Sequence, residues 1–358
     1  MKSRFPLFAL LFLAALSALP GEEAAGQNGS GLFPVNLLLD AARSDEIPWR
    51  PDWPAAMPPD AFSLIAGQAR SLTLTLPAGV LDTADAEASG TGTAGDETGG
   101  EAATLEYRIT RDAQGRFLEF PFFRDGTFYQ AAVVYDDAVP GRIGKITLDN
   151  PAASDPWEFE FLEYKWDDPS LVRLNHGGGE ASGGWYFAAL EYLGRQTNET
   201  WYNPDGLPLA FFSLEYRETS NQRFAGTKRL ISIADGAAIT VYEYNSAGCI
   251  SGISAPPLPV RSVLYTAAAR PRYWERPDAH YTLQWDETGF LTRQTAVKET
   301  GAVRETGEEL DIRYEYILDE RLNWTERREI PLARRFGRLI PGGEVVIGRN
   351  IIYGDGNE

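Results

Sequence analysis

Two glutamates in the segment WEFEFLEYKWDD (157–168) come nearest, in type and spacing, to a hydrolytic pair. Glu158 and Glu160 are two positions apart, so they share one face of a predicted strand whose other face is aromatic. Glycoside hydrolysis needs two carboxyl groups that face each other across a substrate. Acids on the water-facing side of a sheet also serve solubility, and nothing distinguishes this pair from the other acids. We therefore predict no catalytic residue, and a carboxylate-based glycan hydrolase remains the least favoured interpretation.

The residues that usually hold metals or act as nucleophiles are scarce. His176 and His280, the only two histidines, are far apart in sequence, and Cys249 is the only cysteine. A structural or catalytic metal needs such ligands in clusters. The glycine-rich segment NHGGGEASGGW (175–185) has no P-loop lysine, and the motifs of serine hydrolases are absent. The sequence therefore predicts no metal site, no cofactor and no enzymatic activity.

Aromatic side chains offer the better alternative. The chain has nine Trp and sixteen Tyr, and exposed rings on a sheet can stack on sugar rings. Such rings can equally well fill a core or cap hairpins. The candidate ligand-binding residues are Trp185, Trp201, Tyr273, Trp274 and Trp324. They support a carbohydrate-binding, lectin-like protein as the alternative function, with a glycan or another envelope protein as the partner.

The first residues have the composition of an export signal. A basic start is followed by an apolar run from Phe5 to Leu19, which is short for a membrane span. We predict a signal peptide over residues 1–21, with an uncleaved anchor as the alternative. No later apolar run is long enough to span a membrane, and Cys249 lies too far from the start for a lipoprotein. The expected location is periplasmic or extracellular, after Sec export.

The charge excludes one class of partner. The formal net charge is −18, which repels nucleic acid and anionic lipid and favours solubility. We therefore expect no nucleic-acid binding. The ligand or partner itself is not indicated by the composition.

Three regions follow from the patterning. Residues 22–69 form an extended segment rich in proline and tryptophan, with one short helix expected within 34–46 and the rest lying across a surface. Residues 70–358 alternate in the two-residue period of strands, with glycine and proline between them, which predicts an all-β domain. Within it, residues 82–103 carry six acids and no large apolar group, which predicts a disordered insertion or else a linker between domains.

Six segments share one turn layout, in which an aromatic residue precedes Asp or Asn, two turn positions, glycine or a substitute, and an apolar residue. They are RDAQGRF (111–117, with Arg in place of the aromatic residue), WDDPSLV (166–172), YNPDGLP (202–208), YNSAGCI (244–250), WDETGFL (285–291) and YILDERL (316–322). Asp or Asn can accept downstream backbone hydrogen bonds, and glycine supplies positive φ. The layout resembles the RHS/YD repeat, with WDETGFLTRQT (285–295) as the nearest copy. The resemblance implies successive antiparallel hairpins in a meandering or curled sheet, and it does not imply toxin encapsulation.

The densest stretch, RYEYILDERLNWTERREIP (313–331), is expected to be one such hairpin, with Glu320 in place of the turn glycine. Alternation places Tyr314 and Tyr316 on the inner face of its first strand. On the return strand it places Leu322 and Trp324 inward, with Thr325 and Arg327 outward. The preferred function is an exported, non-catalytic β-repeat scaffold or binding protein of the bacterial cell envelope.

Overall fold

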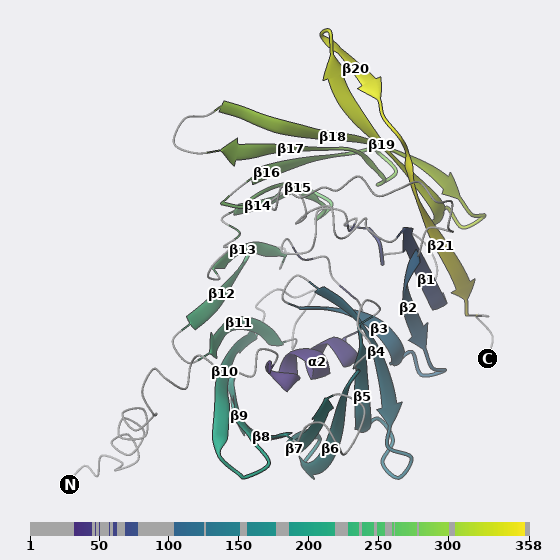
Figure 1. The fold of residues 1–358 in the computed structure, drawn as a ribbon. Coiled ribbons are helices and arrows are strands. Elements are labelled where there is room, and N and C mark those ends of the chain that lie inside the picture. Colours follow the sequence, from purple (N-terminus) through teal and green to yellow (C-terminus); the bar gives the residue numbers. More distant parts are fainter. Residues whose placement is uncertain are drawn as a thin grey trace, which may run out of the picture. The chain divides into compact units, whose positions relative to one another are not determined.

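A computed structural model of the chain describes residues 32–44, 47, 50, 57, 60–62, 69–77, 104–124, 127–150, 156–176, 186–218, 228–235, 238–246, 249–254, 260, 262–277, 279–300 and 305–354 (Figure 1). From Pro34 onward they belong to one compact unit. The predicted signal peptide and the acidic insertion at 82–103 lie outside these residues.

The described chain has one helix, and its strands follow one another almost without interruption. The helix is α2 (Val35–Ala42), inside the range expected for a short helix. The strands are β1 (Ala69–Pro77), β2 (Thr104–Arg111), β3 (Phe117–Arg124), β4 (Thr127–Tyr135), β5 (Ile143–Asp149), β6 (Trp157–Lys165), β7 (Asp168–His176), β8 (Tyr186–Leu193), β9 (Gln196–Tyr202), β10 (Pro208–Glu218), β11 (Lys228–Asp235), β12 (Ala238–Tyr244), β13 (Ile250–Ser254), β14 (Ser262–Tyr265), β15 (Pro271–Glu275), β16 (Ala279–Trp285), β17 (Leu291–Thr300), β18 (Glu305–Leu318), β19 (Trp324–Arg335), β20 (Arg338–Pro341) and β21 (Val345–Tyr353). The all-β prediction is confirmed.

The strands close on themselves. Each pairs antiparallel with its neighbour in sequence, apart from the junctions between β13 and β14 and between β20 and β21. β21 pairs instead with both β1 and β19, which completes the circuit. At the β13–β14 junction the described residues pair through a single bridge between Ile253 and Val260. β20 pairs with β19 alone and extends the edge of the ring. The expected meandering sheet is therefore wrong: the hairpins form a nearly continuous barrel, because the last strand pairs with the first.

The interior is apolar because alternate residues of each strand face inward, as the two-residue period predicts. In β1, Leu72, Leu74 and Leu76 are buried, and the threonines between them are half-buried. The same two-residue period buries Phe159 and Phe161 in β6 and Leu214 in β10. Burial of one face of each strand against the interior supplies most of the stabilisation of such a sheet.

The described residues that precede β1 contact the inner side of the ring. In Figure 1, α2 lies between β3–β5 and β9–β11. Its N-terminal backbone is bound by Glu199 of β9, and Asp40 of the helix accepts a hydrogen bond from Tyr216 of β10 (2.8 Å). Farther along, Met57 and Ala61 are buried, and Phe62 packs against Phe128 of β4. These described residues therefore occupy part of the interior of the barrel.

The outer face carries cross-strand ion pairs. Lys145 of β5 binds Glu158 of β6 (2.7 Å), and Glu160 of β6 binds Arg173 of β7. On the other side of the ring, Arg293 binds Asp311 through two hydrogen bonds of 2.7 and 2.5 Å. Charged pairs in these positions are typical of a sheet face in contact with water.

Five of the six predicted segments form the repeated turn, and in one of these five a different residue takes the position of the glycine. At Asp112, Asn203, Asn245, Asp286 and Asp319 the backbone N–H donates to the carbonyl four residues on, and the side chain accepts downstream backbone N–H groups. The segment at 166–172 is not a copy, because Trp166 and Asp167 form a two-residue turn between paired Lys165 and Asp168. In the last copy Leu322, not Glu320, takes the position of the glycine, with φ of 62°.

Candidate functional site

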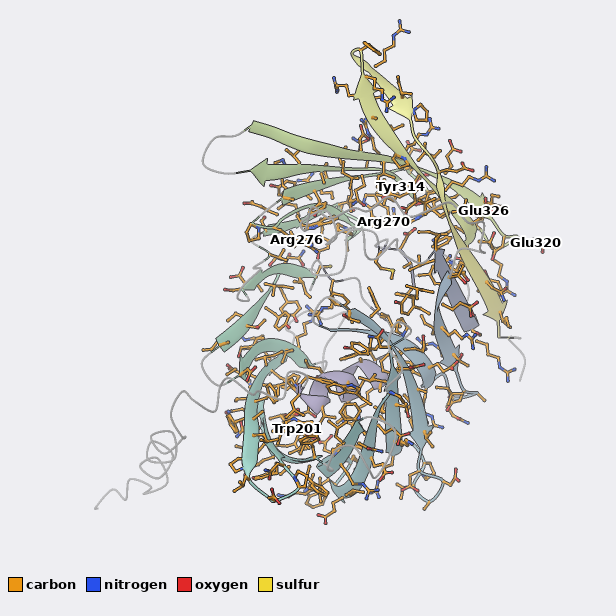
Figure 2. The ribbon with its side chains drawn as sticks, in the orientation of Figure 1. Trp201, Arg270, Arg276, Tyr314, Glu320 and Glu326 are labelled. Carbon is orange, nitrogen blue, oxygen red and sulfur yellow. The ribbon has the colours of Figure 1, made fainter. Side chains whose placement is uncertain are left out.

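The predicted ligand-binding rings do not form an exposed row. Trp201, Trp274 and Trp324 are 0%, 3% and 2% exposed, inside the ring. Trp274 stacks on Tyr281 with ring centroids 4.6 Å apart and planes 10° apart. Tyr273 is half-buried with its ring 6.3 Å from that of His280, and Trp185 lies outside the described residues. Figure 2 shows Trp201 and Tyr314 in separate parts of the ring.

The predicted carboxylate pair is engaged elsewhere. Glu158 and Glu160 each bind a cation from a different neighbouring strand, on the outer face. Cys249 sits in a turn, where its backbone N–H donates to Asn245 (3.0 Å), and burial raises the pKa of its thiol. None of these groups lies at the cavity described next.

A break in the wall creates that cavity. The ladder between β17 and β18 ends at the pair Arg293 and Arg313, although β17 begins at Leu291 and β18 continues to Leu318. Beyond the break, β17 stays with β16 through Leu291 and Trp285, and β18 stays with β19. The two hairpins therefore separate, and a cleft opens between their turns.

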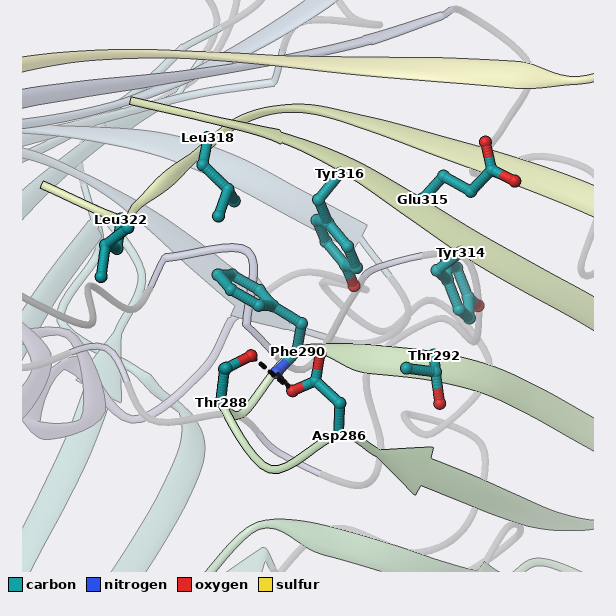
Figure 3. A pocket seen from close by; sticks show the side chains of 9 residues that line it. All are labelled: Asp286, Thr288, Phe290, Thr292, Tyr314, Glu315, Tyr316, Leu318 and Leu322. Carbon is teal, nitrogen blue, oxygen red and sulfur yellow. Dashed lines mark hydrogen bonds between the residues drawn. The ribbon is translucent and has the colours of Figure 1, made fainter. Parts of the chain in front are cut away.

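The cleft is about 470 Å³ in volume and its lining is mostly apolar. The lining residues are Asp286, Thr288, Phe290, Thr292, Tyr314, Glu315, Tyr316, Leu318 and Leu322 (Figure 3). Phe290 and Tyr316 point toward one another, with ring centroids 5.0 Å apart. Leu318 and Leu322 are 39% and 62% exposed, so apolar groups are displayed at its mouth. Volumes of this order suit small-molecule ligands.

Behind the two tyrosines lies a buried polar cluster. Its members are Asp60, Tyr314, Tyr316, Trp324, Arg327, Glu329 and Arg349. Arg327 is 1% exposed; it binds Glu329 and lies 3.6 Å from Asp60 Oδ1. Its guanidinium carbon is 4.9 Å from the centre of the Tyr314 ring, and that of Arg349 is 4.0 Å from the centre of the Trp324 ring. Such contacts between cations and rings are favourable when desolvated.

The expected outward position of Arg327 is wrong because of a β-bulge. Leu318 pairs with Trp324 and Ile317 pairs with Glu326, so Thr325 is an extra residue on β19. One extra residue reverses the alternation that follows it. Trp324 and Arg327 therefore both face inward. The composition of the stretch gives no signal of a bulge, although buried Arg and Glu two apart are consistent with one inner face.

Neighbouring groups determine the pKa values of the two arginines in the cluster. Burial acts to lower the pKa of Arg327, but Glu329, followed by Tyr316, Tyr314 and Asp60, outweighs it, so the pKa is raised. Burial lowers the pKa of Arg349 to about 10, and its Nε donates to the carbonyl of Trp324 (2.9 Å). Both guanidinium groups therefore stay charged at neutral pH, balanced by Asp60 and Glu329.

The acids of the cleft are poorly placed for proton transfer. Burial alone would raise the pKa of Asp286, but bonds from Thr288 and the N–H groups of Phe290 and Gly289 lower it overall. Asp286 is thus an ionised turn residue. Glu315 pairs with Arg313 (3.0 Å) on the same strand. A general acid needs a raised pKa, which Asp286 does not have.

Two negative findings concern the described part of the chain. Its His, Cys, Asp and Glu side chains form no group of three or more that could hold a metal ion. Its helix is not long and apolar enough to cross a membrane.

Comparison with known proteins does not assign the chain to a family. No protein-family model and no curated protein matches the chain. Among solved structures, a porin-like protein from Bacteroides uniformis is similar with a TM-score of 0.26 and 10% identity, over 79% of this chain and 97% of that one. A porin-like protein from Bacteroides vulgatus gives 0.24 and 10%, over 81% and 100%. Likenesses this weak do not carry the porin-like description over to this chain.

The closed ring corrects the resemblance to RHS/YD repeats. The hairpins close through the pairing of β21 with β1, whereas the resemblance implies an open, meandering or curled sheet. The shared turns are a local solution for joining antiparallel strands, which unrelated β proteins also use.

Proposed function

We propose that this chain is an exported, non-catalytic binding protein that holds a small, largely apolar ligand in the cleft between β17 and β18. The observation that carries the proposal is the break in an otherwise paired wall, lined by Phe290, Tyr316 and Leu322. A continuous ladder would be the more stable arrangement for two long neighbouring strands, so the open wedge is consistent with use as a site.

The absence of catalysis in this proposal rests on the acids of the cleft. Asp286 is tied into its turn, and Glu315 is paired with Arg313. The lining residues do not include a Ser, Cys or Lys that a base could activate as a nucleophile. Binding without turnover is the function that these groups support.

The location in this proposal rests on the outer face and on the predicted signal peptide. The ion pairs of β5–β7 and of β17–β18 belong on a face that contacts water, because charges facing lipid are destabilising in membrane barrels. The periplasm or the exterior is the expected compartment. Cell fractionation with mass measurement tests it: a full-length, uncleaved chain in the cytosol would overturn the export.

The binding proposal is tested with a neutral apolar fluorophore, N-phenyl-1-naphthylamine, titrated into the mature protein. Leu322→Gly removes one wall of the cleft and suits the positive φ of 62° at that position. We expect saturable binding to the unaltered protein, weakened by roughly threefold to tenfold in this variant. Because the variant should be at least as stable, unfolding does not explain a loss of binding.

A matched control comes from another turn of the same kind. Ala269 has φ of 59° in the β14–β15 turn and is not among the residues that line the cleft. Ala269→Gly should leave binding unchanged. Binding that is not saturable, or that Leu322→Gly leaves intact, would contradict the proposal. A glycan and peptidoglycan-fragment screen on the same proteins tests the carbohydrate-binding alternative, for which a sugar must compete with the fluorophore.

A further inference from the structure

Several buried donors next to the cleft have no hydrogen-bond acceptor among the described residues. They are the hydroxyl of Tyr316, Nε1 of Trp324 and Nε of Arg327, whereas Nη1 of Arg327 faces Asp60 Oδ1 at 3.6 Å. Trp324 is 2% and Arg327 1% exposed. An unmade bond of a buried donor is destabilising, and native proteins leave few of them. A concentration of such donors in one place therefore points to an acceptor from outside the chain.

The donors lie together. Tyr316 of β18 is directly opposite Arg327 of β19 in the ladder, and both face inward. Opposite residues on one face have Cβ atoms roughly 5 Å apart. The rings of Tyr316 and Trp324 are 6.3 Å apart, and the guanidinium carbon of Arg327 is 6.0 Å from the centre of the Trp324 ring. Tyr316 also lines the cleft, so it connects the donors to the opening (Figure 3).

The hydroxyl of the neighbouring tyrosine is different. Tyr314 donates to Gln294 Oε1 (3.0 Å) inside the protein. Of the two tyrosines in the cleft, Tyr316 is therefore the one whose buried hydroxyl has no hydrogen-bond partner among the described residues.

The charges around these donors favour an uncharged acceptor. Arg327 and Arg349 are balanced by Glu329 and Asp60, so a buried anion would add an uncompensated charge. Asp286 and Glu315 at the cleft, and the formal net charge of −18, act against an anion as well. A cation would lie beside the guanidinium groups of Arg327 and Arg349, which repel it.

We propose that the ligand of the cleft has an apolar or aromatic body that ends in an uncharged oxygen acceptor, such as an amide or ester carbonyl, bound by Tyr316 at the inner end. Phe290, Leu318 and Leu322 contact the body. Arg327 and Trp324 lie behind Tyr316 as further donors. This inference rests on the proposed binding function and adds the chemical class of the ligand.

The test uses four probes that share one ring system and differ in the polar group. They are 2-naphthamide, 2-methylnaphthalene, 2-naphthoate and 2-naphthylmethylammonium, titrated into the full mature protein by following tryptophan fluorescence. We expect the amide to bind about tenfold more tightly than the hydrocarbon, because one hydrogen bond to a buried donor is worth about that factor. The two charged probes should bind no more tightly than the hydrocarbon.

Tyr316→Phe removes the hydroxyl alone. It should abolish most of the advantage of the amide, leave the affinity for 2-methylnaphthalene unchanged, and leave the unligated protein as stable as before. Tyr265→Phe is the matched control, because the hydroxyl of Tyr265 donates to the carbonyl of Ile250 (2.6 Å), away from the cleft. In that variant the preference for the amide should be intact.

The outcomes separate the two proposals. If the hydrocarbon binds and the amide has no advantage, the uncharged acceptor is wrong and the binding function stands. Tightest binding by 2-naphthoate would likewise overturn the acceptor class, as would an advantage of the amide that survives Tyr316→Phe. If no probe binds, the cleft is not a site for such molecules and both proposals fail.

Discussion

Leu322 takes in the β18–β19 turn the position that Gly289 takes in the β16–β17 turn. In each turn an aspartate donates its backbone N–H to the carbonyl four residues on: Asp319 to Asn323 (2.8 Å) and Asp286 to Phe290 (2.9 Å). Both residues have positive φ, 62° for Leu322 and 103° for Gly289. The two turns border the cleft, so a strained leucine stands at its mouth where a glycine would suit the backbone better.

That strain predicts a stabilising substitution. A left-handed backbone is unfavourable for leucine by roughly 1–2 kcal/mol, and glycine loses part of this gain through the entropy of the unfolded chain. Leu322→Gly should therefore raise the free energy of unfolding by about 0.5–1 kcal/mol, measured from the urea midpoint. Leu322→Ala keeps the positive φ and should give no such gain. A lower midpoint for the glycine variant would show that packing of the exposed side chain outweighs the strain.

The second prediction concerns the weakest junction of the ring. Between β13 and β14 the described residues form one bridge, and Tyr265 of β14 donates its hydroxyl across the junction to the carbonyl of Ile250 (2.6 Å). Tyr265→Phe should lower stability by about 1 kcal/mol. It should also speed amide hydrogen exchange in β13 and β14 more than elsewhere. The hydroxyl of Tyr316 has no acceptor in the described chain, so Tyr316→Phe should change neither the stability nor the hydrogen exchange. Equal effects of the two variants would show that the Tyr265 hydroxyl does not stabilise this junction.

The sequence predicts the strands and turns well because both depend on neighbouring residues. The alternation of Leu72, Leu74 and Leu76 and the Asp286–Gly289 turn follow from period and propensity. Closure of the ring does not, since the pairing of β1 with β21 joins the two ends of the domain. A pairing of that kind has no local signature in one sequence.

The candidate site is missed for a related reason. The break between β17 and β18 and the bulge at Thr325 are matters of register, which side-chain types alone do not fix. Arg327 therefore has the pattern of a surface charge and is buried. The rings that the sequence does emphasise, such as Trp201 and Trp274, belong to the interior.

The third prediction contrasts a buried with an outer ion pair. Arg327→Met leaves Glu329, which is 6% exposed, without its cation, and should destabilise the protein by about 3–5 kcal/mol. Lys145→Met removes the partner of Glu158 on the outer face and should change stability by less than about 1 kcal/mol. Chemical unfolding of both variants measures the contrast. Replacing Arg327 and Glu329 together by methionine should recover part of the loss, and a double variant no better than Arg327→Met would refute the pairing as its cause.

The last prediction follows from a glutamate in the centre of the barrel. Glu199 is fully buried, and its carboxylate accepts the backbone N–H groups of Val35 (2.7 Å) and Asn36 (2.8 Å) at the start of α2. Burial raises the pKa of Glu199 to about 8, because it outweighs the two hydrogen bonds, and Asp40 adds to the rise. The tyrosines that face the same region, Tyr192 and Tyr216, have raised pKa values and stay neutral here.

The raised pKa of Glu199 determines whether the free energy of unfolding rises or falls with pH. Between the ordinary pKa of a glutamate and the raised value, the folded chain keeps a proton that the unfolded chain has released. The free energy of unfolding should fall as the pH rises through this window, from about pH 5 to about pH 8, by at most about 1.4 kcal/mol per pH unit. Glu199→Gln cannot ionise, so its unfolding should lack this contribution. Urea unfolding of both proteins at several pH values measures the difference, with Glu160→Gln on the outer face as the control. A difference between the unaltered protein and Glu199→Gln that stays constant across the window would mean that Glu199 is ionised throughout it, and that α2 is held by a charged carboxylate.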